Sequence, residues 1–309
     1  MTKVFWHDLK GIPVGNGIGI FRFGLRSNVA LKPNTFLHEY TSPDATAKYT
    51  RSTAGFGISY LLDHDYKSVY TQAFELLPPA TRQRGIRMLE FGCGGGMNLL
   101  HLVSALGRER IKISKAIGAD FSPVLIEAAR EEAKNYLPDE EQRRVEFYVA
   151  KNETLVEDLS SELGKGKLQL ENSFDFILGV NTIRYCHRAN NELNCAQAIF
   201  HLLAPGGICV VIDMNNQFPF FRSLWRDRLR MHKPDKQECY LPSLQAYVAP
   251  FAATGFEVLR EDHFCWIPHS SGEFMCRALS WLSPFFDTVA PSRAMRSLVV
   301  SRKPAAKAR

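Results

Sequence analysis

The sequence predicts an α/β fold in which a doubly wound, mostly parallel sheet of seven strands carries helices on both faces. Strand-like and helix-like segments alternate along the chain from about residue 86. A glycine-rich turn follows the first strand segment, and residues 174–180 form a near-continuous apolar run of the kind found in buried parallel strands. Strands that alternate with helices in one sheet favour parallel pairing.

Seven short segments have the length and apolar character of strands. The first ends in glycines, and the turn Pro205-Gly206-Gly207 precedes the fifth. The sixth follows a helix end at Thr254-Gly255. In chain order, the predicted strands are residues 87–92, 116–121, 145–150, 174–180, 208–214, 256–263 and 297–303.

Helical patterns fill most of the intervals between these strands. Pro78-Pro79 ends the first predicted helix, since proline is a common helix stop. Ser122-Pro123 opens the third, because proline is favoured in the first helical turn. The predicted helices are residues 63–77, 97–106, 124–136, 191–203, 241–253 and a segment that begins near 272.

The predicted organisation is one domain with helical additions at both ends of the chain. Residues 85–304 are expected to form the domain, with insertions at 215–255 and 264–292 that cap a substrate. Residues 1–84 are expected to form an accessory or lid segment, and 305–309 a basic tail. A chain of 309 residues can bury enough surface to fold without disulfides.

Composition and charge favour a cytoplasmic protein. The net charge is +6, but the last nine residues carry four basic side chains and no acidic one. The seven cysteines have irregular spacing and no C-x-x-C pair, which argues against a disulfide framework and against a metal site. The sequence shows no signal-peptide pattern and no apolar stretch of about 18 residues.

The strongest local signal is the heptapeptide EFGCGGG at residues 90–96, where the first strand passes into a helix. Glycines here let the backbone turn sharply and let a nucleotide-like ligand lie against the main chain. The dinucleotide pattern G-x-G-x-x-G fails, because Met97 or Leu99 stands where its third glycine would fall. No Gly-Lys-Ser/Thr follows, which excludes a P-loop. The pattern that fits is E-x-G-x-G-x-G.

This motif resembles the first motif of the class I S-adenosylmethionine-dependent methyltransferases, an acidic residue followed by alternating glycines after the first strand. The resemblance covers residues 86–214 well and 256–303 loosely. It implies a Rossmann-like fold and the cofactor S-adenosylmethionine, with the methionine part against the glycine loop. The residues of this region that it implies for cofactor binding are Glu90, Gly92, Cys93, Gly94, Gly96 and Asn98.

Later strand ends are also similar to the family. Relatives carry an acidic residue after the second strand that accepts hydrogen bonds from both ribose hydroxyls, and Asp120 stands at that place. Many relatives have an aspartate after the third strand that accepts from the adenine amino group, whereas this chain has Asn152. The 30-residue spacing from Glu90 to Asp120 is longer than the family usually shows. The remaining implied cofactor contacts are Phe121, Ser122, Glu153, Asn181 and Thr182.

The segment after the fourth strand faces both cofactor and acceptor in this family. Tyr185 and His187 are the candidate catalytic bases, needed only if the acceptor must lose a proton. For each residue a purely structural role is the alternative: its side chain packs in the core or, for His187, lies at the solvent-facing start of a helix. Arg184 is a candidate anchor for an acidic or phosphorylated acceptor, or a surface ion pair. His269 joins such a site only if the insertion that carries it folds over the strand ends.

Segments outside the family pattern leave the acceptor open. Tyr40, Tyr49 and Tyr60 are candidates for a lid over the cofactor, with core packing as the alternative. Residues 222–236 combine six Lys/Arg with interleaved apolar side chains. This pattern fits either contact with a membrane surface or lipid, or a solvated cap helix.

We therefore expect an enzyme that transfers a methyl group to a small molecule, whether apolar, lipid-like or phosphorylated, by direct displacement. An RNA-modifying methyltransferase and a non-catalytic scaffold that binds S-adenosylmethionine stay open as alternatives. No separate RNA-binding module is visible, so nucleic acid is not the favoured partner. Peripheral contact with a membrane stays open, and the sequence does not specify the oligomeric state.

Overall fold

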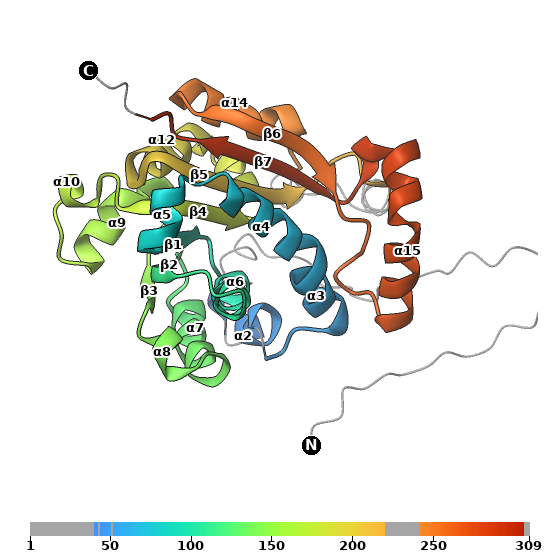
Figure 1. The fold of residues 1–309 in the computed structure, drawn as a ribbon, viewed down its shortest axis with the longest axis horizontal. Coiled ribbons are helices and arrows are strands. Elements are labelled where there is room, and N and C mark those ends of the chain that lie inside the picture. The colour runs from blue at the N-terminus through green and yellow to red at the C-terminus, as the bar shows by residue number, and fades with distance from the viewer. Residues whose placement is uncertain (1–39, 43, 51, 220–240, 306–309) are drawn as a thin grey trace, which may run out of the picture. The chain divides into compact units, whose positions relative to one another are not determined.

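The computed structural model describes residues 40–42, 44–50, 52–219 and 241–305, all of which belong to one compact unit. Its centre is a seven-stranded sheet with the order β3-β2-β1-β4-β5-β7-β6 (Figure 1). Strands β1 to β5 run parallel, and β7 is antiparallel to both β5 and β6. The strands are β1 (Ile86–Phe91), β2 (Ile113–Asp120), β3 (Val145–Val149), β4 (Phe174–Val180), β5 (Leu203–Met214), β6 (Glu257–Phe264) and β7 (Arg296–Arg302).

The predicted seven-stranded, mostly parallel sheet is thus confirmed, and helices cover both of its faces (Figure 1). The helical segment that ends at residue 75 and the helices after β1 and after β2 pack on one face of the sheet. The helices after β3, after β4 and before β6 pack on the other face. The described helices are α2 (Asp44–Tyr49), α3 (Phe56–Leu61), η1 (Leu62–Tyr66), α4 (Lys67–Glu75), α5 (Pro79–Arg84), α6 (Met97–Arg108), α7 (Pro123–Tyr136), α8 (Asp139–Gln142), η2 (Asn152–Thr154), α9 (Leu155–Glu162), α10 (Lys167–Leu170), α11 (Ile183–Arg188), α12 (Glu192–Leu202), α14 (Leu244–Thr254), α15 (Glu273–Val289) and η3 (Pro291–Arg293).

Two apolar cores sandwich the sheet because successive strand side chains point to opposite faces. Met88 of β1 enters the core beneath α4, α6 and α7, whereas Leu89 enters the core beneath α9, α12 and α14. Helix α4 packs in the first of these cores. Phe74 of α4 stacks on Phe176 of β4 with ring centroids 4.3 Å apart. Residues 56–75, within the predicted accessory segment, therefore support the central strands directly.

The two largest errors in the predicted element boundaries concern a helix start and a strand start, whereas the other boundaries differ by at most three residues. The helix predicted from residue 63 begins at Phe56, because apolar side chains such as Leu61 extend its buried face toward the N-terminus. Strand β5 begins at Leu203 instead of 208, since Leu203 already pairs with Phe174. The turn predicted at 205–207 is an irregularity inside this strand, where the amide of Gly206 donates to the carbonyl of Lys303.

Some predicted features fall outside the described residues. These are the first 39 residues of the expected lid, the basic segment 222–236 and the tail from residue 306, since residues 220–240 are also not described. Helix α15, predicted to start near residue 272, is present and exposes a row of large apolar side chains that includes Phe274, Trp281 and Phe285. Within the described part of the chain, none of the helices has the length and hydropathy needed to cross a bilayer.

A buried carboxylate joins the amino-terminal ends of β1 and β4. The side chain of Asp175 is 2% exposed and accepts hydrogen bonds from the backbone and guanidinium of Arg87 and from the guanidinium of Arg84. Burial raises the pKa of Asp175, but these hydrogen bonds outweigh burial and hold the pKa below its ordinary value. The carboxylate therefore stabilises the fold in its ionised form.

We expect Asp175→Asn to lower the free energy of unfolding at pH 7 by about 1–3 kcal/mol, the range for removing one partner of a buried charged hydrogen bond. The depressed pKa means that the stabilisation is present above the unfolded-state pKa and is lost as pH falls through the folded-state pKa. Urea unfolding should therefore show the two proteins converging below about pH 4. Asp139→Asn, at an exposed position on α8, is the control. Equal stabilities at pH 7 would contradict this role for Asp175.

Candidate functional site

The glycine loop follows β1 at the carboxyl-terminal edge of the sheet. Gly92 and Gly94 have φ values of +62° and +54°, which favour glycine over any residue with a side chain. A Cβ on Gly92 would also collide with the side chain of Thr182, which lies at the end of β4. The sequence of the loop thus permits both its left-handed turn and its close approach to the neighbouring strand end. This edge includes the point between β1 and β4 where the strand order reverses, the usual place for ligands in such sheets.

Asp120, the last residue of β2, is fixed by the glycine loop. Its Oδ2 accepts a hydrogen bond from the amide of Gly94 at 3.0 Å, and its Oδ1 accepts from the amide of Ser122 at 2.9 Å. Burial raises the pKa of Asp120, while these two amide donors act to lower it. The carboxylate is held in one orientation, with the backbone donors occupying only part of its hydrogen-bonding capacity.

Glu90 is buried beneath the same loop, with no exposed surface. Its Oε2 accepts from the amide of Leu99 in the first turn of α6 at 3.0 Å. Its Oε1 has no well-formed hydrogen bond among the described residues, although Asn98 lies close enough to lower the pKa. Burial outweighs both contacts and raises the pKa of Glu90 to about 8. Without a cationic partner, this group is therefore largely protonated at neutral pH.

The described residues between 40 and 50 lie against the glycine loop and the start of α7. Thr50 forms isolated β-bridges with Gly95 and Gly96, and a Cβ on Gly95 would stand 2.6 Å from the carbonyl oxygen of Tyr49. The hydroxyl of Ser122 donates to the carbonyl of Tyr40. The loop, the start of α7 and this segment are therefore linked by backbone contacts.

Four aromatic side chains meet above the strand ends. The ring of Tyr40 stacks on Tyr49 with centroids 5.1 Å apart and meets the edge of Phe121 at 5.9 Å. Its hydroxyl lies 2.8 Å from the hydroxyl of Tyr185 on α11. Tyr40 and Tyr49 thus lie beside Phe121 and Tyr185, and their role as a lid stays a prediction. Tyr60 does not join this group of rings in the described structure and contacts Phe56 and His64 nearby in the sequence.

The ends of β3 and β4 bring two predicted residues together. Asn152, at the start of η2, donates from its amide nitrogen to the hydroxyl of Thr182 at 2.7 Å, an orientation that directs the amide oxygen elsewhere. Asn181 has a φ of +55° and donates its backbone N–H to the carbonyl of Ile212. Glu153, by contrast, is exposed to solvent.

A charged cluster follows β4 and β5. The backbone N–H of Arg184 donates to Asp213 at 3.1 Å, and its Nε lies 3.8 Å from the same carboxylate. The guanidinium of Arg184 donates to the hydroxyl of Tyr185 at 2.7 Å and also contacts the sulfur of Met214. Tyr185 therefore has a fixed hydroxyl that faces the lid residue Tyr40.

Arg296 completes this cluster from the antiparallel strand β7. Its side chain is fully buried, donates to Asn181 Oδ1 at 2.8 Å and contacts the ring of His269. Because arginine only donates, the ring nitrogen of His269 that faces it is unprotonated. Burial and the neighbouring charges of Arg296 and Arg184 lower the pKa of His269 well below its usual value, so the ring is neutral.

The structure thus brings most of the predicted residues to one edge of the sheet and adds others. His187 lies on α11, but its side chain is outside the described part of the chain. His269 enters the site because the insertion that carries it folds over the strand ends. Arg296 was missed. Its only sequence signal is a basic residue at the head of an otherwise apolar strand.

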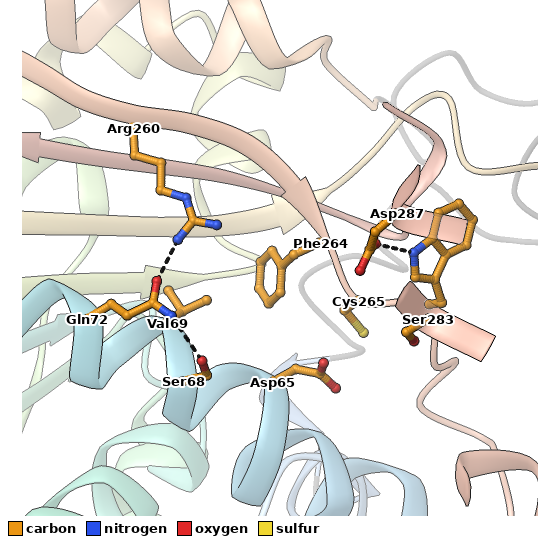
Figure 2. A pocket seen from close by; sticks show the side chains of 10 residues that line it. Asp65, Ser68, Val69, Gln72, Arg260, Phe264, Cys265, Ser283 and Asp287 are labelled. Atoms are coloured by element: carbon orange, nitrogen blue, oxygen red, sulfur yellow. Dashed lines mark hydrogen bonds between the residues drawn. The ribbon is translucent and has the colours of Figure 1, made fainter. Parts of the chain in front are cut away.

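A separate pocket lies between α4, the end of β6 and α15 (Figure 2). Asp65 and Asp287 line it, and Trp266 donates to Asp287 at 2.8 Å. Arg260 reaches Gln72 on its other side. None of its lining residues is among the predicted cofactor or catalytic residues, so we place the candidate site at the glycine loop instead.

The comparison with known proteins shows the family of the chain. The family described as "Methyltransferase domain" matches residues 62–261, more than half of the chain. The matched region includes the glycine loop, the ends of β2 to β5 and the helix before β1. No curated protein matches the sequence.

Solved structures share the fold at low sequence identity. The CMeT domain of the citrinin polyketide synthase is 19% identical, with a TM-score of 0.54 over 87% of this chain and 60% of that one. The CurJ carbon methyltransferase is 20% identical, with a TM-score of 0.52 over 87% and 61%. A chain in the complex of the Haloferax volcanii Trm112 methyltransferase activator with a methyltransferase is 16% identical, with a TM-score of 0.51 over 86% and 96%.

The raised pKa of Glu90 predicts how stability depends on pH. Between an unfolded-state pKa of 4.5 and a folded-state pKa of about 8, the folded protein binds a proton that the unfolded chain has released. The free energy of unfolding therefore decreases as pH rises through this interval. Glu90→Gln removes this dependence. Between pH 5 and pH 9, the free energy of unfolding of the ligand-free variant should therefore rise relative to that of the wild type by a few kcal/mol, since each pKa unit is worth about 1.4 kcal/mol. Parallel stability profiles in chemical denaturation would contradict the assignment.

Proposed function

The chain belongs to the class I S-adenosylmethionine-dependent methyltransferases, and on that premise we propose that it methylates a small molecule enclosed at the carboxyl-terminal edge of the sheet. Its cofactor is S-adenosylmethionine, which supplies a methyl group already activated on a positively charged sulfur. The residues of the chain must then hold this cofactor and align the acceptor with it.

The glycine loop fits this cofactor. Among the described residues, a Cβ on Gly94 would meet only the side chain of Tyr49, at the ordinary contact distance of 3.8 Å, so these residues do not crowd this side of the loop. Glu90 brings a buried oxygen without a full hydrogen-bonding complement to the underside of the loop. A cationic ligand nearby would favour the ionised form of this carboxyl. We propose that the loop holds the methionine part of the cofactor.

The neighbouring strand ends supply acceptors for the rest of the cofactor. We propose that Asp120 accepts hydrogen bonds from the ribose hydroxyls, because its carboxylate is already oriented by two backbone amides. Asn152 is proposed to accept from the adenine amino group, since its own amide nitrogen is engaged by Thr182. Phe121 offers an apolar face beside them, in contact with Tyr40.

The contact between Tyr40 and Tyr185 carries the proposal of a small acceptor. It joins the N-terminal segment to the helix after β4 and so covers the space where methyl transfer would take place. An RNA or protein substrate would need an open approach to that space. A covered site also excludes water, which protects a displacement reaction and strengthens the electrostatic interactions within it.

Methyl transfer mainly requires that the acceptor atom be aligned with the methyl group. The hydroxyl of Tyr185 is held by Arg184 and Tyr40, and we propose that it positions the acceptor or, once it has lost its own proton to solvent, receives the acceptor's proton as the phenolate. His187 stays a second candidate for that proton. Helix α15 exposes Phe274, Trp281 and Phe285, a row that favours contact with an apolar surface, so we keep a membrane-associated acceptor as a variant of this proposal.

Label transfer tests the proposed acceptor class. The protein is incubated with methyl-labelled cofactor and a cell extract, and the products are separated by size before mass spectrometry. We expect label in the small-molecule fraction, at a rate that falls at least tenfold, about 1.4 kcal/mol of activation free energy, for Tyr185→Phe. The exposed variant Asp139→Asn should match the wild type. Label confined to RNA or protein, or no transfer at all, would contradict the proposal.

A further inference from the structure

We propose that the methyl acceptor carries an anionic group, a carboxylate or a phosphate, which Arg184 and Arg296 bind at the carboxyl ends of β4 and β5. This inference rests on the proposed function, since it names the acceptor class of the same site. Its basis is the placement of the two arginines around Met214, which pairs with Arg296 across β5 and β7 and whose sulfur contacts the guanidinium of Arg184.

Arg296 is a buried charge without an anionic partner. Its side chain has no exposed surface, and no carboxylate lies within ion-pair distance of it in the described structure. The side chains that it meets, Asn181, His269 and the hydroxyl of Tyr66, are neutral. Its Nε has no hydrogen-bond acceptor among the described residues. Burying a charge without an opposite charge beside it costs free energy. Because the fold keeps the guanidinium of Arg296 in this state at the ligand-binding edge of the sheet, we infer that its N–H groups are available to bind an anion.

Arg184 is only partly neutralised by Asp213. The carboxylate approaches Nε no closer than 3.8 Å, and its two oxygens accept from the backbone amides of Arg184 and Met214. The terminal nitrogens of Arg184 contact the hydroxyl of Tyr185 and the sulfur of Met214, both uncharged. Its side chain is 18% exposed, so Arg184 is not sealed off from solvent as Arg296 is.

The two arginines act on the same small region. Both lower the pKa of His269, and both lower that of Asp213, in each case after the dominant effect of burial. Among the described residues, the charged groups around His269 are therefore these two guanidinium groups and the carboxylate of Asp213, while Asp65 acts with Arg296 only on the pKa values of Tyr66 and Cys265. Bound S-adenosylmethionine would add the positive charge of its sulfonium to this site. An anionic acceptor would offset this excess, whereas a cationic acceptor would be repelled.

The geometry of guanidinium matches both proposed anions. Its planar fork donates two parallel hydrogen bonds to a carboxylate or a phosphate, which fixes orientation as well as position. Arg184 also holds the hydroxyl of Tyr185. An anion bound by this arginine would thus lie beside the residue proposed to position the acceptor atom.

The test uses the full chain saturated with S-adenosylhomocysteine, the stable product of the cofactor. Inorganic phosphate and labelled acetate are titrated separately at constant ionic strength, and binding is followed by line broadening in their NMR spectra. We expect at least one of the two anions to bind the wild type. Loss of a charge-assisted hydrogen bond should weaken that binding about tenfold or more in Arg184→Gln and in Arg296→Gln. The anion that binds distinguishes a phosphorylated acceptor from a carboxylic acid.

Arg277→Gln is the matched control, since Arg277 pairs with Glu273 on the exposed side of α15. If the glutamine variants do not fold, Arg184→Lys tests the same point, because it keeps the charge and should retain part of the affinity. Binding of S-adenosylhomocysteine without either anion, or equal anion affinities in Arg184→Gln and Arg277→Gln, would overturn the inference alone. Failure of S-adenosylhomocysteine to bind the wild type would overturn the proposed function as well.

Discussion

The carboxylate of Asp120 accepts one hydrogen bond from Gly94 and one from Ser122, and much of the site depends on this arrangement. The first bond sets the glycine loop against the end of β2. The second places Ser122, whose side chain caps α7 through the amide of Leu125 and holds the carbonyl of Tyr40. One buried acidic residue thereby links two strand ends, a helix start and the segment that lies over them.

The same edge of the sheet gathers residues from distant parts of the chain because parallel strands end together. Tyr40 arrives from the N-terminal segment, Tyr185 from the helix after β4, and Arg296 from the antiparallel strand β7. The antiparallel direction of β7 is what brings its first residue, instead of its last, to the carboxyl end of β5. The insertion between β6 and β7 then adds His269. We therefore assign the cofactor side of the site to the first strands and the acceptor side to the last.

The sequence predicted the sheet, most helices and the glycine loop because these depend on local signals. Strand periodicity and the glycines at 92 and 94 are visible without knowledge of the fold. The π-helical turn at η1, which makes one longer helix of α3 and α4, was not predictable, since its side chains become buried only against the sheet. The hydrogen bond from Arg296 to Asn181 joins residues 115 positions apart, and Arg296 belongs to no sequence motif. Such contacts follow from topology, which a single sequence specifies only coarsely.

The central claim is that the glycine loop and Asp120 form the S-adenosylmethionine site, and calorimetric titration of the cofactor tests it most directly. We predict a single binding site in the wild type. We also predict binding weaker by about one to two orders of magnitude in Asp120→Asn, because a charged acceptor is lost. Asp139→Asn, which removes the same charge at an exposed position, should bind like the wild type. Equal affinities in all three proteins, or no binding in the wild type, would contradict the claim.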